Sequence, residues 1–388
     1  MAYSKDKIEE ILNELAHTIN ISDELFQAAN DEYVALGEWI DKKTEDDGND
    51  YKVYIYPQGS FALGTVIRPI TDEDDYDLDL VCELENGQGL SARQLKLGIV
   101  KPWLQNYKKT KTEIEEKRRC WHVEYEDIPC FHMDVIPALR NQYDTKGTMI
   151  LITDKDEDRI PVYEYQGSNP KGYVSWFFNR CRQRKPSGER VQTAVFEMAQ
   201  QEDLKQNKNK TKLQKAVQIL KRHRDIMFAD NPDNKPISII ITTLAGQIYS
   251  GEDSILESLI SFVEKVEEYL FSTMKDGCYS IPNPSYCGED FADKWKEHPE
   301  RQEAFFAWVE QLKKDFNLET LMSRDRVSMG NEVKKAFGEA SGKVVFNVLG
   351  ISEADAVRKG KIKVNTSTGN LSETGTITVP PTRHYGKI

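Results

Sequence analysis

The sequence lacks the features of secreted, membrane-spanning or disulfide-bonded proteins. Only six of its 388 residues are cysteines, and they are scattered without a disulfide framework, so we expect reduced thiols. No run of about 18 apolar residues occurs, which argues against a transmembrane helix. The N-terminal segment carries charged residues from Lys5 onward and lacks the apolar core of a signal peptide. We therefore expect a cytoplasmic, monomeric protein that makes no membrane contact.

A basic excess is also missing. The chain has 52 Lys and Arg against 64 Asp and Glu, a formal net charge of −12. Proteins that hold long nucleic acids usually carry a basic excess, because phosphate contacts supply most of their affinity. Basic residues gather only at 108–119 and 205–215, and we interpret the second run as a loop leading into a helix. The charge balance favours small nucleotides over long nucleic acid as partners.

Three aspartates stand in alternating segments. Asp77 and Asp79 alternate with leucines, which is the period of a β-strand, so they share one face about 7 Å apart. Asp134 lies in a second alternating run, at 129–137. Three carboxylates on strands could hold two divalent cations about 3.5–4 Å apart. We predict Asp77, Asp79 and Asp134 as catalytic and metal-ligating residues for two Mg²⁺ ions, with Mn²⁺ as a substitute.

A glycine–serine turn precedes the acidic strand. Gly59 and Ser60 follow a predicted strand at 54–58 and lead into a short predicted helix at 61–65. Glycine lets the backbone approach a phosphate, helix N-terminal N–H groups attract it, and Ser60 adds a hydroxyl. Alone, Gly-Ser is only a turn signal and Asp-x-Asp is usually solvated surface. Together they predict nucleotidyl transfer, with Gln58 beside the turn.

At these residues the sequence resembles the polymerase-β-like nucleotidyltransferases. Within them it is similar to the branch of cyclic GMP-AMP synthase and 2′-5′ oligoadenylate synthase, which includes the bacterial CD-NTases of CBASS anti-phage signalling. Gly59 and Ser60 match the family's turn, Asp77 and Asp79 its catalytic pair, and Asp134 its third aspartate. The resemblance spans roughly residues 50–300. No cysteine-rich zinc insertion is evident, which favours a bacterial enzyme over the DNA-sensing branch.

The resemblance implies an activity and further site residues. It implies that a cyclic di- or trinucleotide second messenger is made from nucleoside triphosphates such as ATP and GTP, and that this messenger acts on a downstream effector. Lys221 matches the family's lysine for donor phosphates, and Ser238 its serine at a helix start. Lys215 and Arg68 are additional candidates, although a surface or helix-end ion pair explains Arg68 equally well. Asp134 would lie near the acceptor hydroxyl and take its proton.

Other functions fit the same motifs. One is a linear transferase, such as an oligoadenylate synthase or a tRNA 3′-end polymerase, and another is a minimal enzyme that AMPylates proteins or drugs. A catalytically silent nucleotide-binding module belongs to a different class, but all three acidic ligands are present. A zinc site could also form from Cys120, His122, Cys130 and His132 on adjacent strands. Alternation on strands explains that pattern without a metal, and this is the interpretation we favour.

The pattern predicts an α+β fold in two lobes with the active site in a cleft between them. By resemblance, a polymerase-β-like core with a mixed sheet carries a C-terminal helical lobe. We expect N-terminal bracing helices at 1–50, the catalytic core at 51–190, the helical lobe at 191–361 and a flexible tail at 362–388. From residue 173 onward the predicted helices are 173–184, 191–204, 213–227, 237–250, 254–274, 299–315 and 327–338.

In some bacterial relatives the C-terminus is conjugated to target proteins by a ubiquitin-transfer-like partner. Here Lys387 and Ile388 follow Gly386, so a terminal glycine would require trimming.

Overall fold

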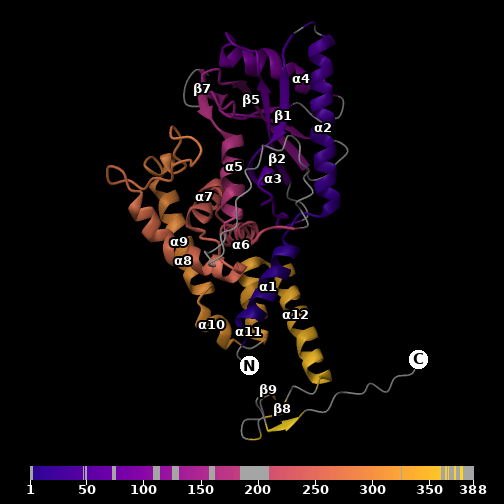
Figure 1. Ribbon diagram of the computed structural model, residues 1–388, viewed down its shortest axis with the longest axis vertical. Helices are drawn as coiled ribbons and strands as arrows, with labels where there is room; N and C mark the ends of the chain where they lie inside the picture. The colour runs from indigo at the N-terminus through magenta and orange to yellow at the C-terminus, as the bar shows by residue number, and fades with distance from the viewer. Residues whose placement is uncertain are drawn as a thin grey trace, which may run out of the picture.

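The computed structural model describes most of the chain, and it has a sheet region at one end and a helical region at the other (Figure 1). The described residues are 3–46, 48, 50–71, 76–107, 114–124, 131–156, 162–183, 209–324, 326–359, 363–364, 366, 371–372 and 376–378. The predicted α+β class, with a mixed sheet and a helical C-terminal region, is confirmed. None of the helices within these ranges is long and apolar enough to cross a membrane.

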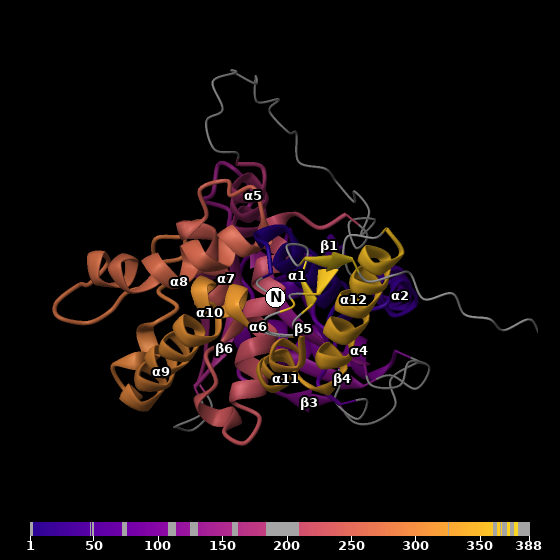
Figure 2. The same ribbon diagram turned by 90° about the horizontal axis from the view of Figure 1, so that it is seen from below.

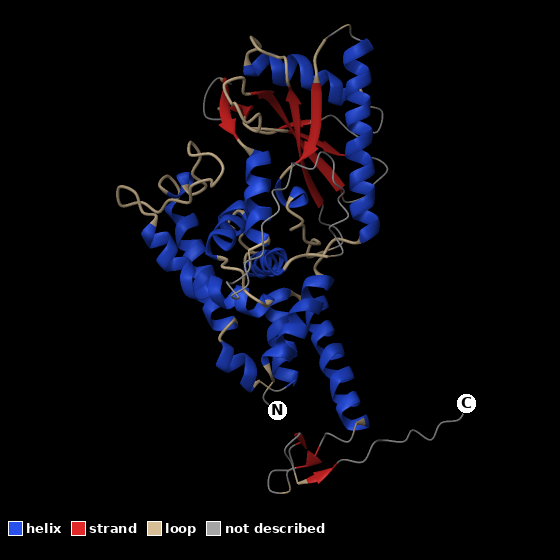
Figure 3. Cartoon of the chain, viewed as in Figure 1, coloured by secondary structure: helices blue, strands red, loops and turns tan. Residues whose placement is uncertain are grey.

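A mixed seven-stranded sheet forms the first region (Figure 3). Its main path runs β1-β2-β5-β4-β3, while β6 pairs with β5 and β7. The pairing of β2 with β5 is parallel and all the others are antiparallel. The strands are β1 (Val53–Pro57), β2 (Tyr76–Leu84), β3 (Glu115–Glu116), β4 (Trp121–Glu124), β5 (Phe131–Arg140), β6 (Ile150–Lys155) and β7 (Tyr163–Ser168).

One face of this sheet is covered by helices. The leucines that alternate with the aspartates on β2, Leu78 and Leu80, are fully buried in a cluster with Leu36 and Ile40 of α2 (Asp23–Asp46). Trp103 of α4 (Lys101–Gln105) joins the same cluster. A π-helical segment, η1 (Gln94–Val100), leads directly into α4. The apolar side of β2 therefore packs inward, and its acidic side faces away from α2.

The helical region has α6 (Lys212–Met227) in its core, where Val217, Ile219 and Leu220 are fully buried. Around it lie α5 (Pro170–Cys181), α7 (Ser238–Ile248), α8 (Ile255–Ser272), α9 (Pro299–Asp315), α10 (Leu318–Ser323), α11 (Arg326–Phe337) and α12 (Glu339–Arg358), with short 3₁₀ turns η3 (Pro232–Asn234) and η4 (Asp293–Trp295). The predicted helix 191–204 lies outside the described residues. Helix α12 was not predicted from the sequence.

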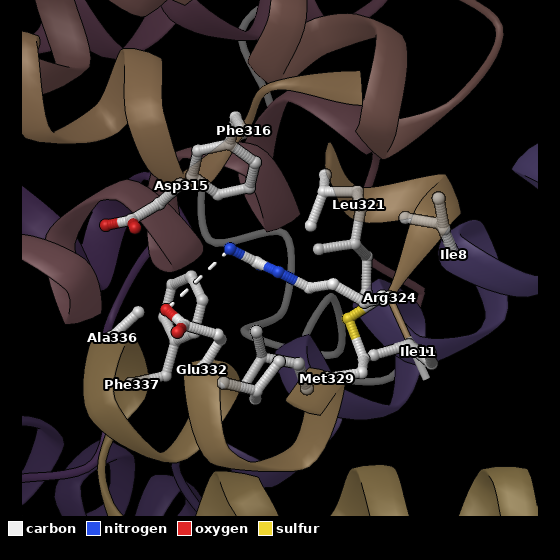
Figure 4. A pocket seen from close by; sticks show the side chains of 13 residues that line it. Ile8, Ile11, Asp315, Phe316, Leu321, Arg324, Met329, Glu332, Ala336 and Phe337 are labelled. Atoms are coloured by element: carbon white, nitrogen blue, oxygen red, sulfur yellow. Dashed lines mark ion pairs between the residues drawn. The ribbon is translucent and has the colours of Figure 1, made fainter. Parts of the chain in front are cut away.

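The two N-terminal helices belong to different regions. Helix α1 (Lys5–Thr18) lies among α6, α8, α10 and α12 (Figure 2), whereas α2 packs on β1. Ile8 and Ile11 of α1 line a hollow of about 500 Å³ of empty space, open solvent included, in which Arg324 extends toward Glu332 (Figure 4). Helix α5 likewise packs into the helical core, through Phe177. The N-terminal bracing helices that we expected at 1–50 are therefore divided between the two regions. Helix α5, which we expected in the catalytic core at 51–190, packs with the helical region instead.

A small antiparallel sheet follows α12. Its strands are β8 (Lys363–Val364), β9 (Leu371–Ser372) and β10 (Ile377–Thr378), in the order β10-β8-β9. These strands fall inside the range 362–388 that we predicted as a flexible tail without regular structure. The C-terminal residues 379–388, including Gly386, lie outside the described residues.

Candidate active site

The strand register brings the three predicted aspartates together. The parallel pairing of β2 with β5 sets Asp79 opposite Asp134 and Asp77 opposite His132. The antiparallel pairing of β4 with β5 sets His122 opposite Asp134. Side chains two residues apart on a strand point to the same face. All five polar side chains therefore lie on the sheet face opposite the α2 cluster.

The carboxylates of this face repel one another. Burial and the charges of Asp134 and Asp77 raise the pKa of Asp79 to about 7. Burial alone would raise the pKa of Asp77 as well, but the hydrogen bond and charge of His132 bring it below the usual value. A bound cation would relieve the repulsion that acts on Asp79. Clustered carboxylate oxygens are the donors that Mg²⁺ prefers, so the residues present fit this ion.

Two histidines interleave with the aspartates. Nδ1 of His122 lies 2.9 Å from Oδ1 of Asp134, and Nε2 of His132 contacts Oδ1 of Asp77. The two imidazole rings are 4.2 Å apart between centroids. Burial and the nearby aspartates raise the pKa of the Cys120 thiol to about 12. We predicted neither histidine as a partner of the aspartates. Their alternation along the strands, which places them on the same face as Asp134, could have indicated it. Cys130 lies outside the described residues.

The glycine–serine turn touches the acidic strand directly. Strand β1 ends at Pro57 and α3 (Gly59–Ala62) follows at once. The backbone N–H of Gln58 donates to the carbonyl of Asp79 at 2.8 Å. Gly59 has φ +59°, and a Cβ added there would collide with Oδ2 of Asp79. Only glycine therefore allows the turn to lie this close to the carboxylate.

Helix α6 faces the segment after the turn with buried polar side chains. Gln214, Gln218 and Lys221 donate to the carbonyls of Leu63, Val66 and Thr65 at 2.9, 2.6 and 2.9 Å. Arg222 donates to the carbonyls of Arg68 and Pro69. These donors come mainly from one side of the helix, at spacings of three and four residues. We call Gln214, Gln218, Lys221 and Arg222 the polar face of α6.

Two lysines converge behind the turn. Lys221 is only 4% exposed, and burial together with the charge of Arg224 lowers its pKa to about 8. Lys210 donates to the carbonyl of Gly64 at 2.6 Å, and burial and the charge of Lys221 lower its pKa to about 7. Sequence reasoning missed Lys210, because it lies in a lysine-rich run that we interpreted as a loop. Its position directly before the helix-capping Thr211 was the signal.

The remaining candidates are placed differently. The hydroxyl of Ser238, at the start of α7, accepts a hydrogen bond from Nη1 of Arg224 at 3.0 Å. Lys215 points to α1, where its Nζ donates to Oδ1 of Asn13 at 2.8 Å. Arg68 is exposed, and its charge acts on Arg222. The structure thus places Lys215 away from the aspartates and shows no contact of Arg68 with them.

Comparisons with known proteins agree with this geometry. The family model "Cyclic GMP-AMP synthase DncV-like, nucleotidyltransferase domain" matches residues 53–137, which include the turn and all three aspartates. A c-di-GMP synthase of Roseivirga ehrenbergii is 29% identical over 320 residues, 80% of this chain and 78% of that protein. The cyclic dinucleotide synthase CdnG of Bradyrhizobium diazoefficiens is 26% identical over 370 residues, covering 88% and 85%.

Solved structures share the fold. The structure of Bradyrhizobium diazoefficiens CdnG in complex with GTP matches with a TM-score of 0.68 at 23% identity, over 89% of this chain and 99% of that one. The Vibrio cholerae cyclic AMP-GMP synthase DncV, in complex with nonhydrolyzable GTP, matches with a TM-score of 0.53 at 15% identity, over 87% and 88%. The chain is therefore similar to the bacterial CD-NTases, and it is a nucleotidyltransferase.

Proposed function

We propose that this enzyme makes a cyclic dinucleotide that contains guanosine from nucleoside triphosphates, in a Mg²⁺-dependent reaction. The observation that carries the proposal is the contact between the turn at Gly59 and the carboxylate of Asp79. This contact supports a phosphate-binding role for the backbone at Gly59, beside the group that would hold a cation. The names of both relatives, a c-di-GMP synthase and a cyclic dinucleotide synthase, support the ring product, and the first supports guanosine.

Each part of the site has a role in this proposal. Asp77, Asp79 and Asp134 would hold the two Mg²⁺ ions, which supply positive charge opposite the phosphates and acidify the attacking hydroxyl. The backbone N–H groups at Gly59 and the Ser60 hydroxyl bind the donor β- and γ-phosphates. Asp134 accepts the proton of the acceptor hydroxyl.

The lysines behind the turn complete the donor site. Lys221 and Lys210 supply positive charge there, and both lie within hydrogen-bond distance of carbonyls in the segment that follows Ser60. Ser238 adds a hydroxyl at the start of α7, held by Arg224. Ring closure then requires the linear intermediate to bind again with its free hydroxyl at Asp134.

The biological part of the proposal is anti-phage signalling. The product would act as a second messenger on a separate effector protein that binds cyclic nucleotides. One solved relative, CdnC of E. coli, forms a complex with a HORMA protein, and we extend the proposal to an activating partner of that kind. Conjugation of the C-terminus stays a prediction, because residues 379–388 lie outside the described residues.

Product analysis tests the proposal. The purified chain is incubated with labelled ATP, GTP, CTP and UTP and either Mg²⁺ or Mn²⁺, and the phosphatase-treated products are identified by mass spectrometry. We expect a phosphatase-resistant species with the mass of a guanosine-containing cyclic dinucleotide, and none without divalent cation. Only linear, phosphatase-sensitive products would assign the chain to the oligomerising transferases. A cyclic trinucleotide would support the proposed cyclisation and contradict only the proposed ring size.

A further inference from the structure

His122, His132 and Asp134 form a cluster of metal-ligating type on the acidic face of the sheet. One ligand atom from each residue lies within 4.8 Å of those of the other two. The side chains of His122, His132 and Asp134 are 20%, 13% and 27% exposed, so the cluster is accessible yet held by its surroundings. It contains two nitrogen donors, which the three-aspartate site does not use.

We propose that these three residues form a binding site for a divalent transition cation of the Zn²⁺ type. Zn²⁺ is bound by imidazole nitrogen at about 2.0–2.1 Å and by carboxylate oxygen at about 2.0–2.2 Å, so neighbouring ligand atoms of a tetrahedral site are about 3.3 Å apart. Nδ1 of His122 and Oδ1 of Asp134 are 2.9 Å apart, close to that spacing. A ring nitrogen of His132 lies within 4.8 Å of a ligand atom of each of these residues.

The backbone holds the ligands in register. His122 lies directly opposite Asp134 in the β4–β5 pairing, and His132 lies on the same face of β5, two residues before Asp134. Asp77 contacts His132, and ligating histidines usually have such an outer carboxylate, which fixes the orientation of the ring. Three protein ligands leave one coordination position open, as in catalytic zinc sites.

The donor set separates this site from the one proposed for Mg²⁺. Imidazole suits zinc and neighbouring transition metals, whereas Mg²⁺ prefers carboxylate and water oxygens. From the sequence we favoured strand alternation without a metal over a zinc site that included Cys120 and Cys130. The structure supplies Asp134 as the third ligand in place of a cysteine. Binding of the cation does not depend on the proposed cyclic product.

One consequence does rest on the proposed function. Asp134 belongs to both donor sets, so a cation held by His122 and His132 occupies a carboxylate that the Mg²⁺ ions require. We expect low concentrations of Zn²⁺ to inhibit Mg²⁺-supported synthesis, and this inhibition to weaken when either histidine is replaced.

The test measures binding without nucleotide and without turnover. Chelator-treated full-length protein is titrated with Co²⁺, a spectroscopic substitute for Zn²⁺, and the visible absorption is followed. We expect one equivalent of Co²⁺ with the intense bands of a four- or five-coordinate ion, displaced by Zn²⁺ and not by excess Mg²⁺. His122→Asn and His132→Asn should each weaken binding by at least about tenfold. His298→Asn, which changes an exposed histidine beside Glu300 on the helical region, should leave it unchanged.

A second measurement uses only the wild-type protein, in case a variant does not fold. Imidazoles are modified with diethylpyrocarbonate with and without Zn²⁺, and the sites are mapped by mass spectrometry. We expect Zn²⁺ to protect His122 and His132 and to leave His298 reactive. Equal protection of all three histidines, or a weak octahedral Co²⁺ spectrum that both variants leave unchanged, overturns the proposal. Neither result bears on the cyclic nucleotide assay, so the two proposals fail separately.

Discussion

The acidic face of the sheet and the polar face of α6 hold charged and polar groups in opposite ways. On the sheet, Asp77, Asp79 and Asp134 crowd like charges together, and the pKa of Asp79 rises to about 7 because of burial and that repulsion. On α6, Gln218 and Lys221 each donate to a specific carbonyl of the segment after the turn. The charge of Asp79 therefore opposes folding until a cation binds, whereas the helix face stabilises the junction of the two regions.

This difference separates catalysis from stability. Substitutions on the sheet face should remove activity without lowering stability, and substitutions on the helix face should do the reverse. Lys221 is the exception, because it lies on the helix face and its charge also acts on Asp79. The variants below test this separation.

The largest expected effect comes from replacing Asp77 and Asp79 together by Asn. Cyclic product should fall below detection, since both oxygen donors for the cations are lost. The melting temperature measured without divalent cation should stay level, because the repulsion at Asp79 disappears while the ion pair of Asp77 with His132 is lost. Asp233→Asn, on the exposed turn η3, is the matched control and should keep full activity. A double variant with wild-type turnover, or one that no longer folds, contradicts the comparison.

Gly59→Ala should have the next largest effect. The added Cβ collides with Oδ2 of Asp79, and φ is +59° at this position. This backbone conformation costs an L-residue about 1–2 kcal/mol. We expect turnover to fall by about 100-fold, because small displacements of reacting groups have effects of this size. Gly98→Ala is the control, since it has no atom within 4 Å of its added Cβ. Initial rates and thermal melts of both variants test this prediction. Equal losses of turnover in the two variants would contradict a special role for Gly59.

The acidic site could be predicted from the sequence because it depends mostly on local pattern. Alternation along β2 places Asp77 and Asp79 on one face, whichever strands β2 pairs with. The position of Asp134 required the pairing of β2 with β5, which no local pattern encodes, and the family resemblance supplied it. The contact of His132 with Asp77 follows from that same register, and we missed it for this reason.

The polar face of α6 could not be predicted in the same way. Gln214, Gln218 and Lys221 have the spacing of a solvated helix face, and their partners are backbone carbonyls, which leave no mark in a sequence. Helix α12 was missed for a different reason. Gly342, Gly350 and several β-branched residues weaken its helical signal, and it is stabilised by packing, with Val345 and Leu349 buried in the helical core.

A third prediction compares two lysines of α6. Lys221→Met keeps the aliphatic stem and removes the charge beside the turn, so we expect the KM for GTP to rise by about tenfold with a smaller change in kcat. Lys215→Met removes only the contact with Asn13 of α1 and should leave KM unchanged. Steady-state kinetics on the two variants test this. Equal KM values for both would place Lys221 with the structural residues of the helix face.

The smallest expected effect concerns the other side of α6. His223 lies two residues after Lys221, about 200° around the helix, and is 2% exposed. The indole N–H of Trp308 can only donate, so Nδ1 of His223 accepts it at 3.0 Å, and Nε2 then donates to Oδ2 of Asp315 at 2.9 Å. Burial would raise the pKa of Asp315, but the hydrogen bonds from His223 and Gln311 bring it below its usual value.

Because the pKa of Asp315 is lower in the folded than in the unfolded chain, its carboxylate stabilises the fold above the unfolded pKa of about 3.9, and this stabilisation is lost as the pH falls through the folded pKa. Asp315→Asn keeps an oxygen that accepts both hydrogen bonds and loses only the charge. We expect it to lower the free energy of unfolding by about 1 kcal/mol near pH 7, with the difference shrinking below about pH 4 and disappearing once the pH falls below the folded pKa. Urea unfolding across this range measures the difference, and cyclic product should be unchanged at neutral pH. If the difference in unfolding free energy were independent of pH, Asp315 would stabilise α6 through its geometry and not through its charge. This side of the helix would then resemble the polar face of α6 instead of contrasting with it.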